Sequence, residues 1–506
     1  MANNPSQTHA TTQAIARMSA YDTLGGSPEW HALKPTAIAG VTASTETAIH
    51  DTIDATNQYE AGSIVGLSAS TPLEMGVTYQ ALDYFVPAAM RTAWSGPRAL
   101  VTSATRPTSA TSAHFVVPAM ADALPALTLV KISGCAVAAN NGVKVVASGG
   151  STTQIPITGG LTAETFTAAQ NVTIEVCGYQ FASGDLTLTS SGGVNTLATT
   201  TKDLTELQLV SGQAIWIGDT SAAAYSFATA ADYGPARLTA TPTANAMTVD
   251  GTFGTFTTDN GSSKTIRLFF GRTARVVGRD SGSYAESYFQ VETAVENLGA
   301  SNAPHYLYLD NGAIGALEIS APSAALATMT ATLTGTDVTN TDTRRTNASA
   351  PTLPKRTVAY NTTTDSSGRV FLSSDNSQVT GYITSATLAI DNAANANPVH
   401  GKLGSAITTF GKIRVTLSLD VFLTESIVIT GARTNLEMRA NWWLRNGDGA
   451  ICFDIPSARI MVGSAAFPAG QVVTIPVEVT ANADTTWGTS LIASLVPGCP
   501  ALIARA

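Results

Sequence analysis

The sequence predicts a mainly all-β protein, built from sandwich or barrel units with short helices. Its composition is 44% hydrophobic but only 12% charged, against a usual charged share of about 25%. Thr, Ser, Asn and Gly supply the other polar residues, and these suit strands and turns. Short apolar runs also alternate with turn residues along the chain. Its 506 residues exceed the roughly 250–300 at which one core stops growing, so we expect about two to four domains.

The N-terminal part of the chain predicts an arm followed by strands. Residues 1–36 form the predicted arm, with a short amphipathic piece at Ala14–Met18 and a loop at Gly25–Pro28. Residues 37–98 are predicted to begin the first β domain, because apolar and polar residues alternate from Leu73 to Tyr79.

A helix is predicted directly after these strands, in the stretch QALDYFVPAAMRTAW. Its apolar residues Leu82, Phe85 and Ala89 recur at helical spacing. Pro87 has no backbone N–H and fits only near a helix start or at a break. We therefore expect any helix here to be short or interrupted.

Residues 99–270 predict an inserted or decorating β domain. Strand-like runs at Leu127–Ile132, Val143–Ala147 and Val172–Val176 are separated by Asn-Asn-Gly and Gly-Gly turn signals. Short strands at this regular spacing are typical of a β-sandwich or a small barrel.

The second half of the chain repeats the strand pattern of the first. Residues 271–334 predict a second set of wall strands, and residues 335–375 predict a long polar loop with weak strand signals. Residues 376–506 are the predicted C-terminal domain. The Asn-Gly-Asp-Gly run at residues 446–449 predicts a hairpin turn there.

One strand stands out, and its residues are the candidate functional site. Its apolar and polar residues alternate strictly: Lys412, Ile413, Arg414, Val415, Thr416, Leu417, Ser418, Leu419, Asp420 and Val421. Such a strand has one apolar and one polar face, and it is longer than the usual strand of about 5–6 residues. A long strand with one wet face suits the shared wall of a barrel or tube.

The charge of the chain argues against nucleic-acid binding. The formal net charge is −9 and the isoelectric point is about 5.2, and the 27 basic residues are scattered without long runs. The N-terminus lacks the pattern of a secretory signal, and no apolar run is long enough for a transmembrane helix. The sequence thus predicts a soluble protein made in the cytoplasm.

The four cysteines are predicted to be buried free thiols. Cys135, Cys177, Cys452 and Cys499 stand far apart with no CxxC pair, so zinc or redox use is not expected. A bridge between Cys135 and Cys177 stays open as an alternative.

The sequence predicts no enzyme, no cofactor and no metal site. The six histidines stand alone without a metal-binding or nucleophile motif. Asp448 lies in a Gly-rich turn but lacks the remaining ligands of a calcium loop, so a plain turn is favoured. Lys412 and Arg414 are favoured as a solvated strand face or an ion pair between subunits, with contact to DNA phosphates as the alternative.

Two groups of segments, one near each end of the chain, follow one another in a characteristic order, and none carries a catalytic signature. They are Ser27–Leu33, Ile38–Val41, Ser44–Asp51 and Gly62–Trp94 in the first group, and Gly381–Ser385, Leu388–Asn392, Gly411–Thr416, Leu419–Asp420 and Gly431–Thr434 in the second. Together they resemble the major tail tube proteins of long-tailed, siphovirus-like bacteriophages. The resemblance covers about half of the chain, and the middle matches only loosely.

This resemblance implies a structural virion protein. Tail tube subunits join into rings, and the rings stack into a channel through which double-stranded DNA passes without specific binding. A weak similarity between residues 62–94 and 403–433 favours two fused tube units in one chain. Three chains would then close a ring of pseudo-sixfold symmetry; without the fusion, six chains would be needed. The arm and the polar loop are candidate segments that order on contact with the next ring.

The resemblance also implies partners and a location. The chain would contact other copies of itself, the tape measure, the tail terminator and the distal tail protein, with no membrane. It would be assembled in the host cytoplasm and reside in the tail of the virion, and its size favours a non-contractile tail. The alternative is a surface adhesin or glycan-binding β-sandwich protein, which shares the Thr-, Ser- and Gly-rich composition.

Overall fold

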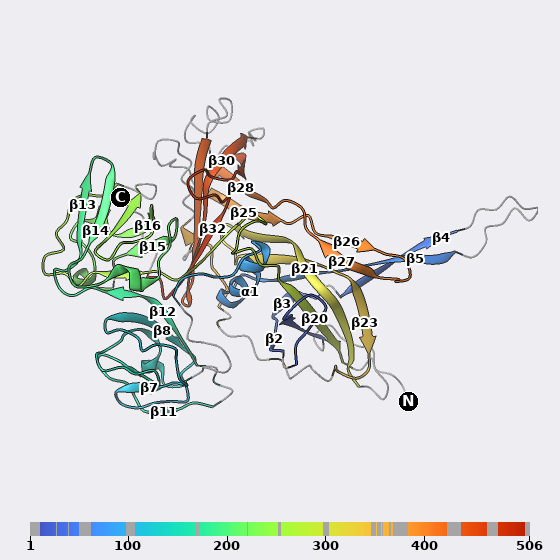
Figure 1. Cartoon of the computed structure of the whole chain (residues 1–506), viewed down its shortest axis with the longest axis horizontal. Coiled ribbons are helices and arrows are strands. Elements are labelled where there is room, and N and C mark those ends of the chain that lie inside the picture. The colour runs from blue at the N-terminus through green and yellow to red at the C-terminus, as the bar shows by residue number, and fades with distance from the viewer. Residues whose placement is uncertain are drawn as a thin grey trace, which may run out of the picture.

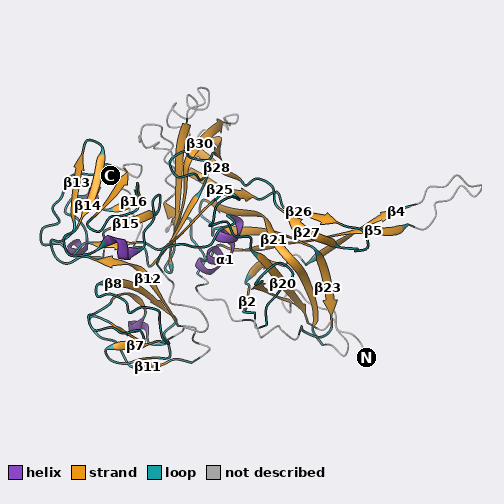
Figure 2. Cartoon of the chain, in the orientation of Figure 1, coloured by secondary structure: helices purple, strands orange, loops and turns teal. Residues whose placement is uncertain are grey.

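The computed structural model confirms the predicted mainly all-β fold with short helices. Most of the elements are strands, and Figure 2 shows how few helical segments lie among them. The described residues are 11–26, 28–38, 40–49, 62–97, 107–167, 170, 172–219, 221–250, 255–296, 303–345, 351, 356, 358–363, 366–367, 383–422, 437–462 and 474–500.

An antiparallel sheet forms the centre of the molecule (Figure 1). Each strand pairs with the next in the following spatial order: β4 (Thr42–Ala48), β5 (Ser63–Gly76), β22 (Thr328–Gly335), β21 (His305–Pro322), β25 (Ile383–Asp391), β28 (Arg414–Phe422), β31 (Thr474–Ala481) and β30 (Gly449–Val462). Apolar residues of these strands share one large core. The sheet therefore has one dry face and one wet face.

Strand β21 is long enough to pair with different strands along its two halves. Its second half pairs with β22 and β25, while its first half pairs with β20 (Tyr288–Val295) and β23 (Asp337–Thr341). Strand β23 lies within the predicted polar loop, so part of that segment is a regular strand. A two-residue strand, β24 (Ser366–Ser367), pairs with β29 (Glu437–Arg445).

The predicted N-terminal arm, in its described residues, joins the same sheet beside β20. Strand β1 (Thr11–Arg17) pairs with β20 and with β2 (Trp30–Ala32). Ala14, Ala16 and Trp30 are buried together with Tyr308 of β21. Residues 11–17 and 30–32 of the arm therefore already pair and pack within their own chain, whereas residues 1–10 lie outside the described residues.

The predicted hairpin is confirmed at the other end of the main sheet. Strands β29 and β30 flank the turn at residues 446–448, and the Asn446 side-chain oxygen accepts hydrogen bonds from the backbone N–H groups of Asp448 and Gly449. The N-terminal half of β30 also pairs with β32 (Ile492–Pro497), which pairs with β19 (Arg272–Arg275).

Helix α1 (Tyr79–Ala89) covers the dry face of the central sheet. The Thr78 hydroxyl accepts a hydrogen bond from the Ala81 N–H and caps the first turn. Pro87 lies inside the helix and leaves the carbonyl of Asp83 without its usual partner, but the indole N–H of Trp94 donates to that oxygen at 3.0 Å. The prediction of a short or interrupted helix is thus confirmed in its first form, because α1 has 11 residues and continues through Pro87.

The end of α1 is tied to the strands of the candidate site. The Arg91 guanidinium donates to the backbone carbonyl oxygens of Asn392 and Gly411 at 2.8 and 3.0 Å, and it lies over the ring of Phe410. The Asn392 side-chain amide donates in turn to the carbonyl of Ala89. These contacts fix the turn that leads from β25 toward β28.

Residues 107–270, called the insert below, have hydrophobic cores of their own. Figure 1 shows the insert, in cyan and green, beside the main sheet. A nine-stranded sheet has the order β13 (Thr187–Ser191), β14 (Val194–Ala198), β17 (Ala246–Asp250), β16 (Gly234–Leu238), β15 (Ala214–Ile217), β18 (Arg267–Phe269), β12 (Thr173–Gln180), β8 (Thr128–Ser133) and β9 (Gly142–Val145).

A second, smaller sheet completes the insert. Its order is β10 (Gln154–Pro156), β7 (His114–Val116), β6 (Ser109–Ala110) and β11 (Glu164–Thr165). The predicted strand runs near residues 127, 143 and 172 correspond to β8, β9 and β12.

Three short strands complete the list of strands. Strand β3 (Pro35–Ala37) pairs with the end of β5. Strands β26 (Asn395–Pro398) and β27 (Ser405–Thr409) form a separate two-stranded hairpin. Among the described residues, no helix is both long and apolar enough to cross a lipid bilayer.

Candidate functional site

The predicted wall strand corresponds to β28, with one correction at its start. The strand runs from Arg414 to Phe422, so Lys412 and Ile413 precede it. Just before this strand, the Arg91 guanidinium donates a hydrogen bond to the Gly411 carbonyl. The alternation itself is confirmed: Val415, Leu417, Leu419 and Val421 are buried, while Arg414, Ser418 and Asp420 are exposed and Thr416 is half-buried.

The outward side chains of β28 belong to a continuous polar face. In one row across the sheet, neighbouring strands place these residues opposite one another: Glu74, Thr330, Glu318, Ala389, Thr416, Thr480 and Arg459. The adjacent row consists of Thr328, Ser320, Thr387, Ser418, Glu478 and Met461. We call this surface the polar face. Most of its side chains carry hydroxyl or carboxylate groups.

Carboxylates outnumber cations on the polar face. The acidic side chains are Glu74, Glu318, Asp391, Asp420 and Glu478, and the basic side chains are Arg414 and Arg459. Arg414 forms an exposed ion pair of 3.4 Å with Glu478, and the Ser385 hydroxyl donates to Asp420 at 2.6 Å. Arg414 was predicted to lie on a solvated face or to form an ion pair between subunits. In the structure it is exposed and pairs with Glu478 of its own chain. The polar face would repel a polyanion rather than bind it.

The described histidines belong to no larger group of metal-ligating side chains. No group of three or more His, Cys, Asp or Glu side chains is arranged for a metal ion in this part of the chain. His31 lies 3.8 Å from Glu29, and His305 pairs with Asp342 on the opposite strand end at 2.6 Å. His9 and His50 lie outside the described residues.

Two exposed hairpins extend from one end of the central sheet (Figure 1). The first, β4–β5, exposes about half or more of the side chains of Ile49, Ile64 and Val65. The second, β26–β27, exposes Val399, Leu403 and Ile407 to a similar extent. Both hairpins meet the turn that follows β22, through the Ala69–Gly335 pair and the Ser405 N–H bond to the Thr336 carbonyl. We call these two hairpins the apolar arms.

A buried ion pair links the insert to the main domain. Arg237 of β16 is fully buried, and its guanidinium lies 2.8 Å from Asp454 of β30 and 2.6 Å from Asp250 of β17. Its plane also covers the ring of Trp487 at 4.4 Å. Burial lowers the pKa of Arg237, but the two carboxylates outweigh burial and raise that pKa above its ordinary value. Arg237 is therefore charged at every accessible pH.

A second buried network joins the insert to helix α1. Glu175 of β12 accepts hydrogen bonds from Arg356 at 2.6 Å and from the Tyr79 hydroxyl at 3.1 Å. Arg272, which also pairs with Asp83 at 2.9 Å, lies 3.7 Å from Glu175. Burial raises the pKa of Glu175, but the two guanidinium groups outweigh burial and hold it below its ordinary value. Glu175 is a carboxylate at neutral pH.

Apolar packing surrounds these two networks. The rings of Trp216 in the insert and Trp443 in β29 meet edge to face, with 5.8 Å between their centroids. Trp442, the neighbouring residue, is buried in the main core on the other side of the sheet. A Cβ atom at Gly271 would lie 2.0 Å from the Leu495 carbonyl oxygen, so only glycine fits where the chain returns from the insert.

The four cysteines are free and buried, as predicted. Cys177, Cys452 and Cys499 belong to the apolar cluster between insert and main domain, and Cys135 lies in the core of the small sheet. Burial raises the pKa of each of these thiols. Protonated and covered thiols are poor nucleophiles, so these side chains act as packing groups.

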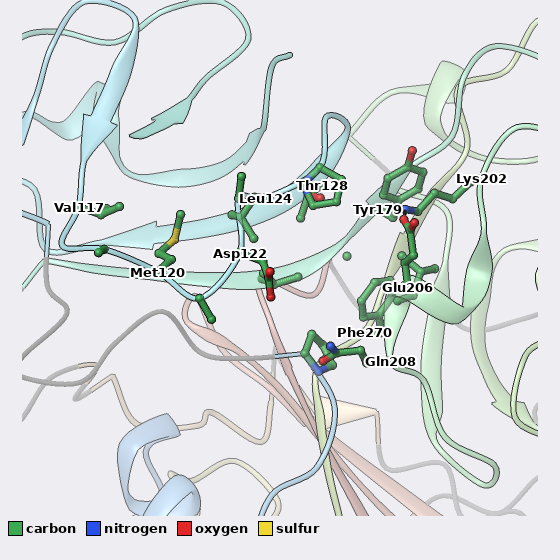
Figure 3. A pocket seen from close by; sticks show the side chains of 18 residues that line it. Val117, Met120, Asp122, Leu124, Thr128, Tyr179, Lys202, Glu206, Gln208 and Phe270 are labelled. Carbon is green, nitrogen blue, oxygen red and sulfur yellow. Dashed lines mark hydrogen bonds and ion pairs between the residues drawn. The ribbon is translucent and has the colours of Figure 1, made fainter. Parts of the chain in front are cut away.

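A cleft of about 790 Å³ lies in the insert, between the segment at residues 117–125 and the face formed by β12 and residues 202–208 (Figure 3). Met120 and Leu124 line one side, and Tyr179 and Phe270 line the other. Lys202 pairs with Glu206 and lies 5.2 Å from the centroid of the Tyr179 ring. The cleft is thus mostly apolar, and its ammonium group is already neutralised by a carboxylate.

The comparisons with known proteins leave the geometry as the main guide to function. No model of a known protein family matches this chain, and no curated protein matches it in sequence.

Proposed function

We propose that this protein polymerises as stacked rings into a bacteriophage tail tube and forms the channel for double-stranded DNA. The observation that carries the proposal is the polar face, a wide surface of hydroxyl and carboxylate groups on one side of the central sheet. A channel wall for DNA should present such groups, because they keep the wall wet without holding phosphates. The proposed role is structural and involves no catalysis.

Unpaired strand edges support self-association. Among the described residues, the first part of β5, Ser63–Ser68, pairs on one side only, with β4, because the pairing with β22 begins at Ala69. A two-stranded hairpin is marginal in water by itself, and an unpaired edge is a template for another chain. Closing a ring would pair these edges between neighbouring subunits.

The number of chains in the ring remains part of the proposal. We favour three chains with pseudo-sixfold symmetry, and six chains are the alternative. This number is supported by a similarity between residues 62–94 and residues 403–433, each of which has a strand followed by an apolar segment. In the first copy β5 leads into α1, whereas residues 423–433 of the second lie outside the described residues. Tape measure, terminator and distal tail proteins complete the proposed set of partners in the virion tail.

Electron microscopy of the purified protein tests the proposal directly. We expect rings or stacked tubes with an axial channel, and a reconstruction should place Glu318 and Asp420 on the channel wall. Monomers that stay dispersed at high concentration would contradict a tube. If such monomers bound oligosaccharides, the adhesin alternative would gain support, and the cleft of the insert would be its candidate site.

Reversing charge on the polar face should turn a passive wall into one that retains DNA. In the variant Glu318→Lys/Asp420→Lys, tubes assembled with DNA should retain nuclease-resistant DNA at low salt and release it as salt rises. Wild-type tubes should retain little. The matched control is Asp122→Lys/Glu206→Lys, which changes the same charge on the insert. DNA bound by the control should remain nuclease-sensitive, and equal protection in both variants would place the polar face outside the channel.

A further inference from the structure

The cleft of the insert has the size and the wall chemistry of a ligand site. Its volume of about 790 Å³ lies within the roughly 300–1,000 Å³ that is usual for ligand pockets. Met120 and Leu124 form one side, and Tyr179 and Phe270 form the other. Figure 3 shows Asp122 between these two sides. The proposed channel wall uses the central sheet and leaves this cleft without a role.

Both sides of the cleft are held in place by contacts within the chain. The Met120 N–H donates to the Thr152 carbonyl at 2.8 Å, and Met120 and Leu124 pack against the core beside the small sheet. Tyr179 and Phe270 belong to another core of the insert. A site that is formed before binding loses little free energy in ordering its own side chains.

The loop on one side of the cleft offers backbone donors. Among the residues that the structure describes, the N–H groups at positions 121–124 donate to no acceptor. An extended peptide that runs along this loop can accept hydrogen bonds from successive N–H groups, as peptides do when they add to the edge of a sheet. A compact small molecule can use few of these donors.

The charge of the cleft favours a basic occupant. The Lys202 side chain is 8% exposed, and its ammonium group already pairs with Glu206. Asp122 also lines the cleft and forms no ion pair within the described part of the chain. The charge that remains without a partner is therefore a carboxylate, which attracts a cation and repels an anion.

The aromatic side chains of the cleft suit a peptide better than a sugar. A sugar ring stacks on an exposed aromatic face, but Tyr179 is 7% exposed and Phe270 is 1% exposed. Lys202 also lies 5.2 Å from the centroid of the Tyr179 ring and covers one of its faces. The apolar side chains of a peptide need no stacking geometry, because burial of apolar surface is not directional.

We propose that the cleft binds an extended peptide segment of a partner protein, in which a basic side chain stands among apolar ones. The basic group faces Asp122, and the apolar side chains lie against Met120 and Leu124. This inference goes beyond the proposed function, because it gives the insert a binding role of its own.

A peptide array tests the chemistry of the occupant. Short peptides in which Lys, Glu or Gln stands among Ala, Leu, Pro and Phe are immobilised and probed with the labelled full-length protein. We expect the Lys peptides to bind best. By fluorescence anisotropy, the strongest of them should bind Asp122→Lys about tenfold more weakly than wild type, because attraction becomes repulsion. Asp122→Glu keeps the charge and should bind within about threefold of wild type.

Two further variants separate the cleft from the rest of the insert. Ala123 is exposed and lines the cleft, so Ala123→Trp should fill it and abolish peptide binding without changing the unfolding curve. Val194→Lys adds a positive charge at an exposed residue outside the cleft lining and should bind peptides like wild type.

Several results would overturn this inference: no peptide binding, equal binding of Glu and Lys peptides, full binding by Ala123→Trp, or oligosaccharides that occupy the cleft in place of peptides. None of them bears on the tube, since the cleft variants should form the same rings as wild type. A wild-type protein that forms no rings would refute the proposed function and leave peptide binding intact.

Discussion

Replacing Arg237 with Met is expected to lower the free energy of unfolding by about 3–5 kcal/mol. The substitution leaves the carboxylate of Asp454, which is 1% exposed, without its cation in the apolar junction between insert and main domain. It also removes the contact with Trp487. Chemical denaturation should show the loss, and hydrogen exchange should rise first in β16 and β30.

An exposed arginine provides the control for this prediction. Arg279 pairs with Glu286 at 3.6 Å, but its side chain is 78% exposed. Arg279→Met should therefore change stability by less than about 1 kcal/mol. The double variant Arg237→Met/Asp454→Leu should recover much of the lost stability, because it removes the buried charge as well as its partner. Equal effects of Arg237→Met and Arg279→Met would show that the buried pair contributes no more than a surface pair.

Replacing Glu175 with Gln should have an effect of similar size, about 3–5 kcal/mol. Gln keeps the shape of the side chain but removes the charge that neutralises Arg356, whose side chain is 6% exposed. Arg272 retains Asp83 as a partner, so we expect most of the cost to arise at Arg356. Denaturation of Glu175→Gln, Arg356→Met and the double variant measures the coupling between the two side chains.

The pH dependence of stability gives this prediction a second readout. The folded pKa of Glu175 lies below its unfolded value near 4.5, so its contribution is fully present above that pH. It is lost as pH falls from about 4.5 through the folded pKa. In that window the stability of wild type should fall more steeply than that of Glu175→Gln, by up to about 1.4 kcal/mol per pH unit. Parallel curves would mean that Glu175 is not the ionised partner of Arg356.

Much of the local structure was predictable because it depends on neighbouring residues. The alternation from Val415 to Val421 requires a strand with one dry face, whatever its partners are. The Asn-Gly-Asp-Gly run produces the β29–β30 turn through hydrogen bonds to Asn446. The thiols of the four cysteines were expected to be buried because their spacing offers no ligand or exchange motif.

Boundaries were less predictable because distant residues decide them. Lys412 and Ile413 continue the alternating pattern, but Arg91, far away in sequence, binds the Gly411 carbonyl and delays the start of β28. Pro87 would interrupt a helix in isolation. Here Trp94 satisfies the carbonyl that the proline leaves free, and the packed core retains the turn.

The sequence by itself determined the fold class, the two-faced strand at residues 414–422 and the acidic balance of the chain. Only the tertiary structure decided that Glu74, Glu318, Thr416 and Thr480 share one row, because strand pairing joins segments from all parts of the chain. It also brought Arg237 to Asp454, which are 217 residues apart, and left Ile64 and Leu326 uncovered. The physical reason is that periodicity records which side of an element is apolar, whereas partner, burial and charge pairing arise only when the elements pack together.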